Sequence, residues 1–274
     1  MKIAHTIAHT LSKGLVEENE DTFRITEKFL ALADGAGGVG VFAKEWATYL
    51  LEHLPDEPFN ENSFDEWHKI TKEEFKKQQN LFLQQSPEKE FVKNKFQQEG
   101  SASTLAIAWL QTRENITTLT YGDSAILHYQ SLDDTLSTSL TISNFIEAPC
   151  LVGTQKPIDA KCLSVRTLSL APNDLLLIAS DALAAYLIAA YTLSHRQHTE
   201  FAQHFRKVLD TPTLLGQIAE NLQNFGIGNY DFRNEILPPL LTDNFQAFAE
   251  HIKLLQDKKL MMKDDVTLIA YSCV

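Results

Sequence analysis

Acidic residues stand at the ends of several apolar, β-rich runs of this chain. They lie at Glu20-Asp21, Asp34, Asp123, Asp181 and Asp264-Asp265. One acid in such a place usually forms a turn or caps a helix. Acids at five such places are harder to explain in that way, because converging strand ends would gather carboxylates that repel one another unless cations or protons neutralise them. Oxygen ligands without His or Cys favour magnesium or manganese over zinc. The pattern therefore predicts a divalent-metal site.

A glycine-rich segment, Gly35–Gly40, follows the second of these acids and matches the G-x-G-x-x-G pattern of dinucleotide-binding turns. Asp56 stands roughly where such a site places its ribose-binding acid. Three observations count against this interpretation. Asp34 would put a carboxylate beside the pyrophosphate, the stretch Pro55–Pro58 leads into no second strand, and the pattern explains none of the later acids. A dinucleotide-binding oxidoreductase is therefore the less favoured alternative.

The hydrophobic pattern predicts the elements that must position these residues. Strands are expected at Phe29–Ala33, Ser103–Leu110, Ile116–Tyr121, Ala125–Gln130, Leu136–Ile142, Leu163–Leu170, Leu175–Ala179 and Val266–Tyr271. Helices are expected at Val41–Leu54, after a Ser63/Glu66 capping box, after Thr211-Pro212 and after an Asp243 cap. Because the helices are grouped between groups of strands, we expect an α+β layered domain without alternating βαβ units.

Composition narrows the class of protein. The chain has 274 residues, 44% of them hydrophobic and 22% charged, which suits a folded globular protein and excludes disorder. Its net charge of −12 argues against nucleic-acid binding, which needs a basic face. Three cysteines (Cys150, Cys162 and Cys273) are too few and too scattered to predict a disulfide framework or a zinc site. No secretory signal is evident, so we expect a cytoplasmic protein.

One apolar stretch, Leu175–Leu193, is long enough to cross a bilayer. Asp181 stands near its centre, where a carboxylate costs about 3 kcal/mol on insertion scales. Leu175–Ala179 is typical of a buried strand, and Asp181–Leu193 of an Ala/Leu-rich helix that begins after Ser180. We therefore expect no membrane span, and we place Asp181 at a strand-to-helix junction.

Taken together, the acidic motifs resemble those of the metal-dependent protein phosphatases of the PPM (protein phosphatase 2C) type, in their bacterial form. Each motif alone is weak, but the set occurs in the family's order and covers most of the chain. The motifs are Lys13-Gly14-Leu15-Val16 with Asn19-Glu20-Asp21, Leu32-Ala33-Asp34-Gly35-Ala36-Gly37-Gly38, Gly100-Ser101-Ala102-Ser103-Thr104-Leu105, Tyr121-Gly122-Asp123-Ser124, Leu175–Ala182 and Asp264-Asp265-Val266-Thr267.

This resemblance implies a four-layer α/β/β/α sandwich in which two antiparallel sheets pack face to face with helices outside. It implies one domain over residues 1–274, with a mainly helical insert at about 183–259. It also implies two or three manganese or magnesium ions and a metal-bridging water that attacks a phosphoserine or phosphothreonine. By the family's pattern, Asp34 would bridge two metals, and the Gly35 carbonyl would ligate one of them. Asp181 and Asp264 would complete the ligands of the second metal. Glu20 and Asp21 would bind through waters, and Asp123 would serve a third, weaker metal.

The chain departs from the family's pattern where substrate phosphate is gripped. Glu17 and Glu18 occupy the stretch that usually carries an arginine, which leaves Lys13 as the candidate phosphate-binding residue. Ala182 replaces the glycine of the SDG motif, which is tolerable if its φ is negative. Two further departures, Ala125 for a basic residue and Asp265 for an asparagine, remove no expected ligand.

The sequence is therefore interpreted as a metal-dependent serine/threonine phosphoprotein phosphatase with a phosphorylated protein substrate and a cognate kinase. A phosphatase-like scaffold that binds phosphoproteins without turnover is the alternative that the missing arginine motivates.

Overall fold

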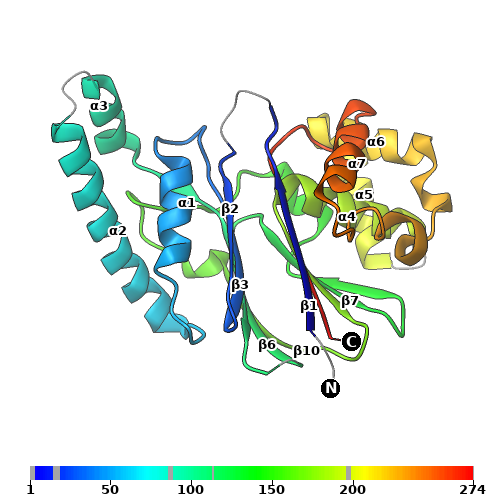
Figure 1. Ribbon diagram of the computed structural model, residues 1–274. Helices are drawn as coiled ribbons and strands as arrows, with labels where there is room; N and C mark the ends of the chain where they lie inside the picture. Colours follow the sequence, from blue (N-terminus) through cyan, green and yellow to red (C-terminus); the bar gives the residue numbers. More distant parts are fainter. Residues whose placement is uncertain (1–3, 15–18, 86–88, 113, 196–198, 274) are drawn as a thin grey trace. The chain divides into compact units, whose positions relative to one another are not determined.

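The computed structural model describes residues 4–14, 19–85, 89–112, 114–195 and 199–273 (Figure 1). The backbone divides into two compact units. Unit 1 comprises Met1–Glu17, Ala125–Pro149 and Leu170–Val274, and unit 2 comprises Glu18–Ser124 and Cys150–Ser169. Each unit has its own five-stranded sheet and its own hydrophobic core.

The sheet of unit 1 is antiparallel throughout, with the strand order β1-β12-β11-β7-β8. The first and last strands of the chain are neighbours in it, since Ala4 pairs with Cys273 and Leu11 with Val266. The strands are β1 (Ala4–Leu11), β7 (Ala125–Gln130), β8 (Thr135–Thr138), β11 (Leu175–Ala179) and β12 (Val266–Cys273).

Helix α4 is the centre of the unit 1 core, because every side chain from Ala182 to Leu193 is buried. A helix enclosed on all sides has no polar face, and this explains why the stretch is apolar throughout. No helix in the described part of the chain is both long and apolar enough to span a membrane. The helices of unit 1 are α4 (Asp181–Ser194), α5 (Thr199–Leu209), α6 (Leu214–Phe225) and α7 (Phe245–Asp257), with short turns at η2 (Ile142–Ile146), η4 (Ile227–Asn229) and η5 (Phe232–Ile236).

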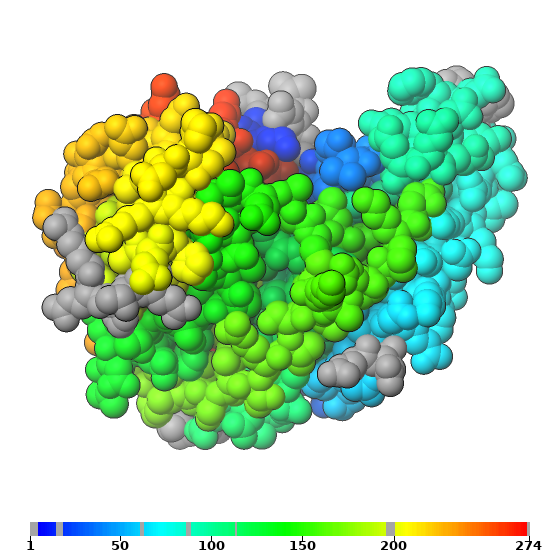
Figure 2. Space-filling model, turned by 180° about the vertical axis from the view of Figure 1, so that it is seen from behind, coloured from blue at the N-terminus to red at the C-terminus, as the bar shows by residue number. Residues whose placement is uncertain are grey.

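Unit 2 is built on a second antiparallel sheet of order β10-β6-β5-β3-β2, with a separate two-stranded β4-β9 ladder. Helix α1 packs against β2 and β3 and buries Trp46 completely. Helices α2 and α3 follow it and form part of the surface seen in Figure 2. The elements are β2 (Asp21–Ile25), β3 (Phe29–Asp34), α1 (Ala43–Glu52), α2 (Glu61–Gln84), α3 (Glu90–Glu99), β4 (Ala102–Ser103), β5 (Leu105–Leu110), β6 (Asn115–Tyr121), β9 (Val152–Gly153), η3 (Ala160–Cys162) and β10 (Leu163–Ser169).

Two antiparallel sheets accompanied by helices confirm the predicted α+β class. Several local details differ from the sequence prediction. The expected strand at Ser103–Leu110 is divided at Thr104 into β4 and β5, although the Thr104 amide still donates to the Asp34 carbonyl. The expected strand at Leu136–Ile142 stops at Thr138.

Helix caps account for two further differences. At the start of α2, Asn60 and Ser63 bond each other's backbone amides through their side chains, so the cap lies three residues before the predicted one. Helix α7 is capped by Asn244, not by Asp243. In both cases asparagine forms the cap, and its side-chain oxygen is as effective there as that of serine or aspartate.

A disulfide joins Cys150 and Cys162, whose Cα atoms lie 6.1 Å apart in unit 2. The number and spacing of the cysteines did not predict a disulfide framework. In the described part of the chain the structure has this one disulfide. The link closes a 12-residue separation just before β10.

Candidate metal centre

Two of the predicted ligands face each other in the sheet of unit 2. Asp21, the first residue of β2, pairs directly with Asp34, the last residue of β3. Direct partners in an antiparallel pair share one face of the sheet, with Cβ atoms about 5 Å apart. Asp21 is 2% exposed and Asp34 is half-buried. Two carboxylates in such a place repel unless a cation or a proton neutralises them, so this pair fits a divalent ion.

The glycine loop after β3 makes room for a third carboxylate. A Cβ on Gly37 would lie 1.9 Å from Oε1 of Glu20, so only glycine lets that side chain occupy its place. The Gly35 amide donates to the Glu20 carbonyl over 3.2 Å. The space beside Gly37, where a dinucleotide-binding turn would admit a pyrophosphate, therefore holds a carboxylate. This finding disfavours the oxidoreductase alternative.

Residues of the Gly100–Leu105 motif hold this loop in position. The Asp34 carbonyl accepts hydrogen bonds from the Thr104 amide and the Ser103 hydroxyl, both over 2.8 Å. The Ala36 amide donates to the Ala102 carbonyl over 2.9 Å. The backbone and hydroxyl groups of this motif thus fix Asp34, for which the family resemblance implies a metal-bridging role.

Asp123 lies on a turn that requires glycine before it. Gly122 has φ +103°, and a Cβ there would lie 2.8 Å from the Cys150 carbonyl oxygen. The Ser124 hydroxyl, fully buried, lies 2.6 Å from that of Thr104. Asp123 is half-buried at this turn. The turn is therefore locked both to the preceding motif and to the segment that carries the disulfide.

In unit 1, Asp181 stands at the predicted strand-to-helix junction. It is the first residue of α4, directly after Ser180. The Ser180 amide donates to the Thr267 carbonyl over 3.1 Å, and the Thr267 amide donates to the Ser180 hydroxyl over 2.9 Å. These bonds tie the end of β11 to the start of β12. Ala182 lies inside the helix and not among the residues with positive φ, so its replacement of glycine causes no strain.

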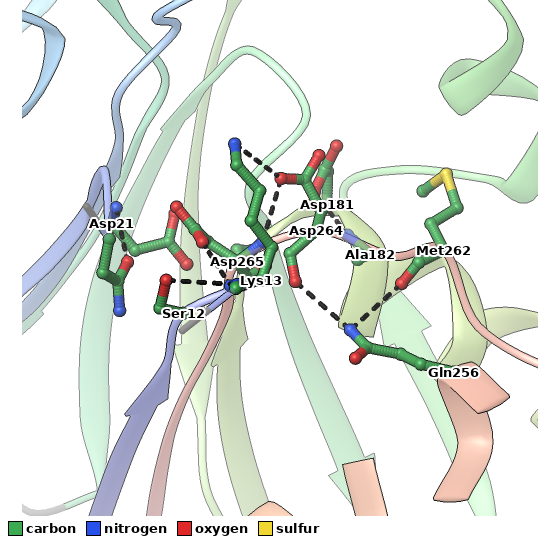
Figure 3. Close-up of polar contacts among 12 residues, drawn as sticks. Ser12, Lys13, Asp21, Asp181, Ala182, Gln256, Met262, Asp264 and Asp265 are labelled. Atoms are coloured by element: carbon green, nitrogen blue, oxygen red, sulfur yellow. Dashed lines mark hydrogen bonds and ion pairs between the residues drawn. The ribbon is translucent and has the colours of Figure 1, made fainter. Parts of the chain in front are cut away.

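Asp264 and Asp265 have different surroundings (Figure 3). Asp265 is 4% exposed, and its carboxylate accepts a hydrogen bond from the Lys13 amide over 2.7 Å. This bond holds the backbone of Lys13 in place. The side chain of Asp264 is 46% exposed, and its Oδ1 lies 3.4 Å from Nζ of Lys13. Gln256 donates to the carbonyls of Met262 and Asp264 and so holds the segment to α7. Asp264 is thus the neighbour that a solvent cation can reach.

The predicted ligands are divided between the two units. Asp181, Asp264 and the candidate phosphate-binding residue Lys13 belong to unit 1, and the remaining ligands to unit 2. Among the described residues, no three His, Cys, Asp or Glu side chains form a group that could hold a metal ion. Glu17 and Glu18, on the stretch of the missing arginine, lie outside the described residues.

Sequence reasoning missed one cation near these acids. Lys44, in the first turn of α1, donates through Nζ to the carbonyl of Asn19, next to Glu20 and Asp21. No motif marks this lysine, because it lies 25 positions along the chain from its acceptor.

Comparison with known proteins was informative only at the level of structure. No family model matches the chain, and no curated protein matches it. The catalytic domain of the serine/threonine protein phosphatase PstP, in complex with two manganese ions, is 16% identical with a TM-score of 0.55 over 100% of both chains. A bacterial serine phosphatase is 14% identical with a TM-score of 0.55, over 99% of this chain and 98% of its own. PppA, a regulatory component of the type VI secretion system in Pseudomonas aeruginosa, is 13% identical with a TM-score of 0.53 over the same shares. The fold of this chain is therefore that of the PPM-type serine/threonine phosphatases.

Proposed function

We propose that this chain is a metal-dependent serine/threonine phosphoprotein phosphatase that hydrolyses phosphate monoesters with manganese or magnesium. The observation that carries the proposal is the Asp21–Asp34 pair, two carboxylates placed directly across β2 and β3 with one of them buried. Such a pair needs a positive counter-charge, and its oxygen donors suit a hard divalent ion. The fold that the chain shares with serine/threonine phosphatases supports the same conclusion.

We propose that residues 1–274 form one phosphatase domain. When bound, the cations would lower the pKa of a bridging water and neutralise the phosphoryl oxygens. The protein's part is to hold its oxygen donors in place before substrate arrives. The proposed ligands are Asp34, the Gly35 carbonyl, Asp181 and Asp264, with Glu20 and Asp21 binding through water and Asp123 serving a third ion.

Lys13 is the residue that we propose for substrate phosphate. Its ammonium group lies 3.4 Å from Oδ1 of Asp264, a proposed ligand, so it is held next to the carboxylate by charge attraction. A lysine is a point charge without the fork geometry of arginine, so it would bind phosphate less specifically. We propose a phosphorylated protein as substrate, a cognate kinase as partner and a cytoplasmic location.

The test is hydrolysis of para-nitrophenyl phosphate with manganese, with and without a chelator. Asp34→Asn should lower the rate by at least about a hundredfold, because it removes a charge that the proposal places between two ions. Asp56→Asn is the matched control, since it makes the same change at an exposed position of the same unit and should leave the rate unchanged.

Three outcomes would contradict the proposal. Turnover that survives the chelator would exclude a metal-dependent reaction. Manganese binding without turnover would favour the scaffold alternative, and binding of a nicotinamide dinucleotide would favour the oxidoreductase.

A further inference from the structure

We infer that Lys44 is a positioning residue that holds the Asn19–Asp21 segment where its carboxylates can serve a metal ion. The inference rests on the proposed function for its purpose and on the contacts of unit 2 for its geometry. The Nζ atom of Lys44 donates to the carbonyl of Asn19, the residue before Glu20 and Asp21.

The helix that carries Lys44 has a fixed position. Its Trp46 is fully buried, and the indole Nε1 donates to the Val152 carbonyl over 2.7 Å. At the helix start, Phe42 adopts a left-handed conformation with φ +57°, and its ring packs on Phe96 with centroids 5.5 Å apart. A non-glycine residue in that conformation persists only where its surroundings enforce it. Lys44 therefore extends from a rigid base.

Helix α1 also lies close to the glycine loop. A Cβ on Gly35 would lie 2.9 Å from the backbone carbonyl of Ala43, the residue before Lys44, and equally close to the Glu20 carbonyl oxygen. Gly35 therefore lies against both the start of α1 and the acidic segment, and a side chain there would contact both. This contact places the lysine within reach of Asn19.

Three contacts of different kinds hold the acidic segment. The Asn19 carbonyl accepts from Lys44, the Glu20 carbonyl accepts from the Gly35 amide over 3.2 Å, and the Asp21 amide donates to the Asn19 side chain over 2.9 Å. The Lys44 contact differs from the other two because its donor is a charged ammonium group. This charge-assisted bond holds the backbone just before the two residues whose carboxylates the proposal uses.

Removing the lysine should therefore loosen the segment and weaken metal binding without altering the chemistry of the loaded site. Groups that orient metal ligands typically change metal affinity by about 10–100-fold when they are replaced. We expect the dissociation constant for manganese to rise by about tenfold in Lys44→Met. Lys44→Arg, which keeps the charge and the donors, should restore most of the affinity. Lys69→Met is the matched control, because that lysine is exposed on α2 in the same unit and pairs only locally with Asp65.

The experiment measures manganese binding by calorimetry on the full chain and, without metal, amide hydrogen exchange of residues 19–25. The inference predicts weaker binding and faster exchange in Lys44→Met than in Lys69→Met, with recovery in Lys44→Arg. At saturating manganese, KM for para-nitrophenyl phosphate should match that of the wild type.

Unchanged exchange in Lys44→Met would overturn the inference, whether or not the wild type binds manganese. So would a raised KM with unaltered metal affinity, which would make Lys44 a substrate contact. If the wild type binds no manganese but the exchange still differs as expected, the proposed function fails while the positioning role stands.

Discussion

Acidification should lower the stability of unit 2, because it forces a proton onto one buried histidine, His68 of α2. Its side chain is fully buried, and its Nε2 lies 3.0 Å from the Gly153 carbonyl, which ties α2 to β9. Nδ1 is buried and has no hydrogen-bond partner among the described residues. Burial lowers the pKa of His68 to about 4, although the bond to Gly153 opposes this shift. Protonation would place a charge and a second donor where nothing accepts them.

The direction of the effect follows from the order in which the two states bind the proton. The unfolded chain takes it up near the ordinary pKa of 6.5, and the folded protein only near 4. The stability that neutral His68 contributes is therefore complete above about pH 6.5 and is lost as the pH falls toward 4. With those two values, the loss between pH 7 and pH 4.5 is about 2 kcal/mol.

Urea unfolding of wild type and His68→Gln at both pH values measures this loss. Glutamine does not titrate, and its amide can donate to the Gly153 carbonyl in place of Nε2. The stability of wild type relative to the variant should fall by about 2 kcal/mol on acidification. The comparison cancels the carboxylates, which titrate in both proteins. Parallel curves for the two proteins, or a His68 resonance that titrates near pH 6.5, would refute the reasoning.

Three further outcomes are expected. Asp264→Asn should abolish manganese-dependent hydrolysis, whereas Asp265→Asn should retain activity and lower the melting temperature. If only Asp265→Asn lost activity, Asp265 and not Asp264 would be the metal ligand. Replacing Cys150 and Cys162 together by serine should lower the free energy of unfolding by about 3 kcal/mol, which is the value expected for a closed loop of this size. An unchanged midpoint of urea unfolding would contradict this prediction. Gly122→Ala should cost about 1–3 kcal/mol, since its φ of +103° and the nearby Cys150 carbonyl both oppose a side chain, and differential scanning calorimetry would show whether it does.

Strands rich in buried apolar residues could be predicted from the sequence with correct bounds. Ala125–Gln130 and Leu175–Ala179 are strands β7 and β11 as predicted, and Asp181 begins a helix as predicted. Both strands lie inside the five-stranded sheet of unit 1, with a partner on either side. An interior strand needs apolar residues on both faces, and that leaves a clear signal.

Features set by distant parts of the chain could not be predicted in this way. Helical spacing alone predicts that Phe225 of α6 and Phe245 of α7 lie on apolar faces. Both are more than 40% exposed, because each lies at a helix end, beyond the packed core. The strand register that brings Asp21 opposite Asp34 is absent from the local pattern, as is the approach of Cys150 to Cys162. The family resemblance indicated the candidate ligands, but only the structure shows that Asp21 and Asp34 are neighbours.

The pairing of the first strand with the last has a consequence for synthesis on the ribosome. Strand β12 lies between β1 and β11, so the sheet of unit 1 cannot close until Cys273 has left the exit tunnel. Unit 2 is complete once Ser169 emerges. Non-local pairing of this kind slows folding and leaves strand edges open while the chain grows. Chains stalled after residue 169 should protect the unit 2 core from protease, while β1 and β7 remain sensitive until Cys273 has emerged. Protection of both units in the same stalled chains would show that unit 1 folds without its last strand.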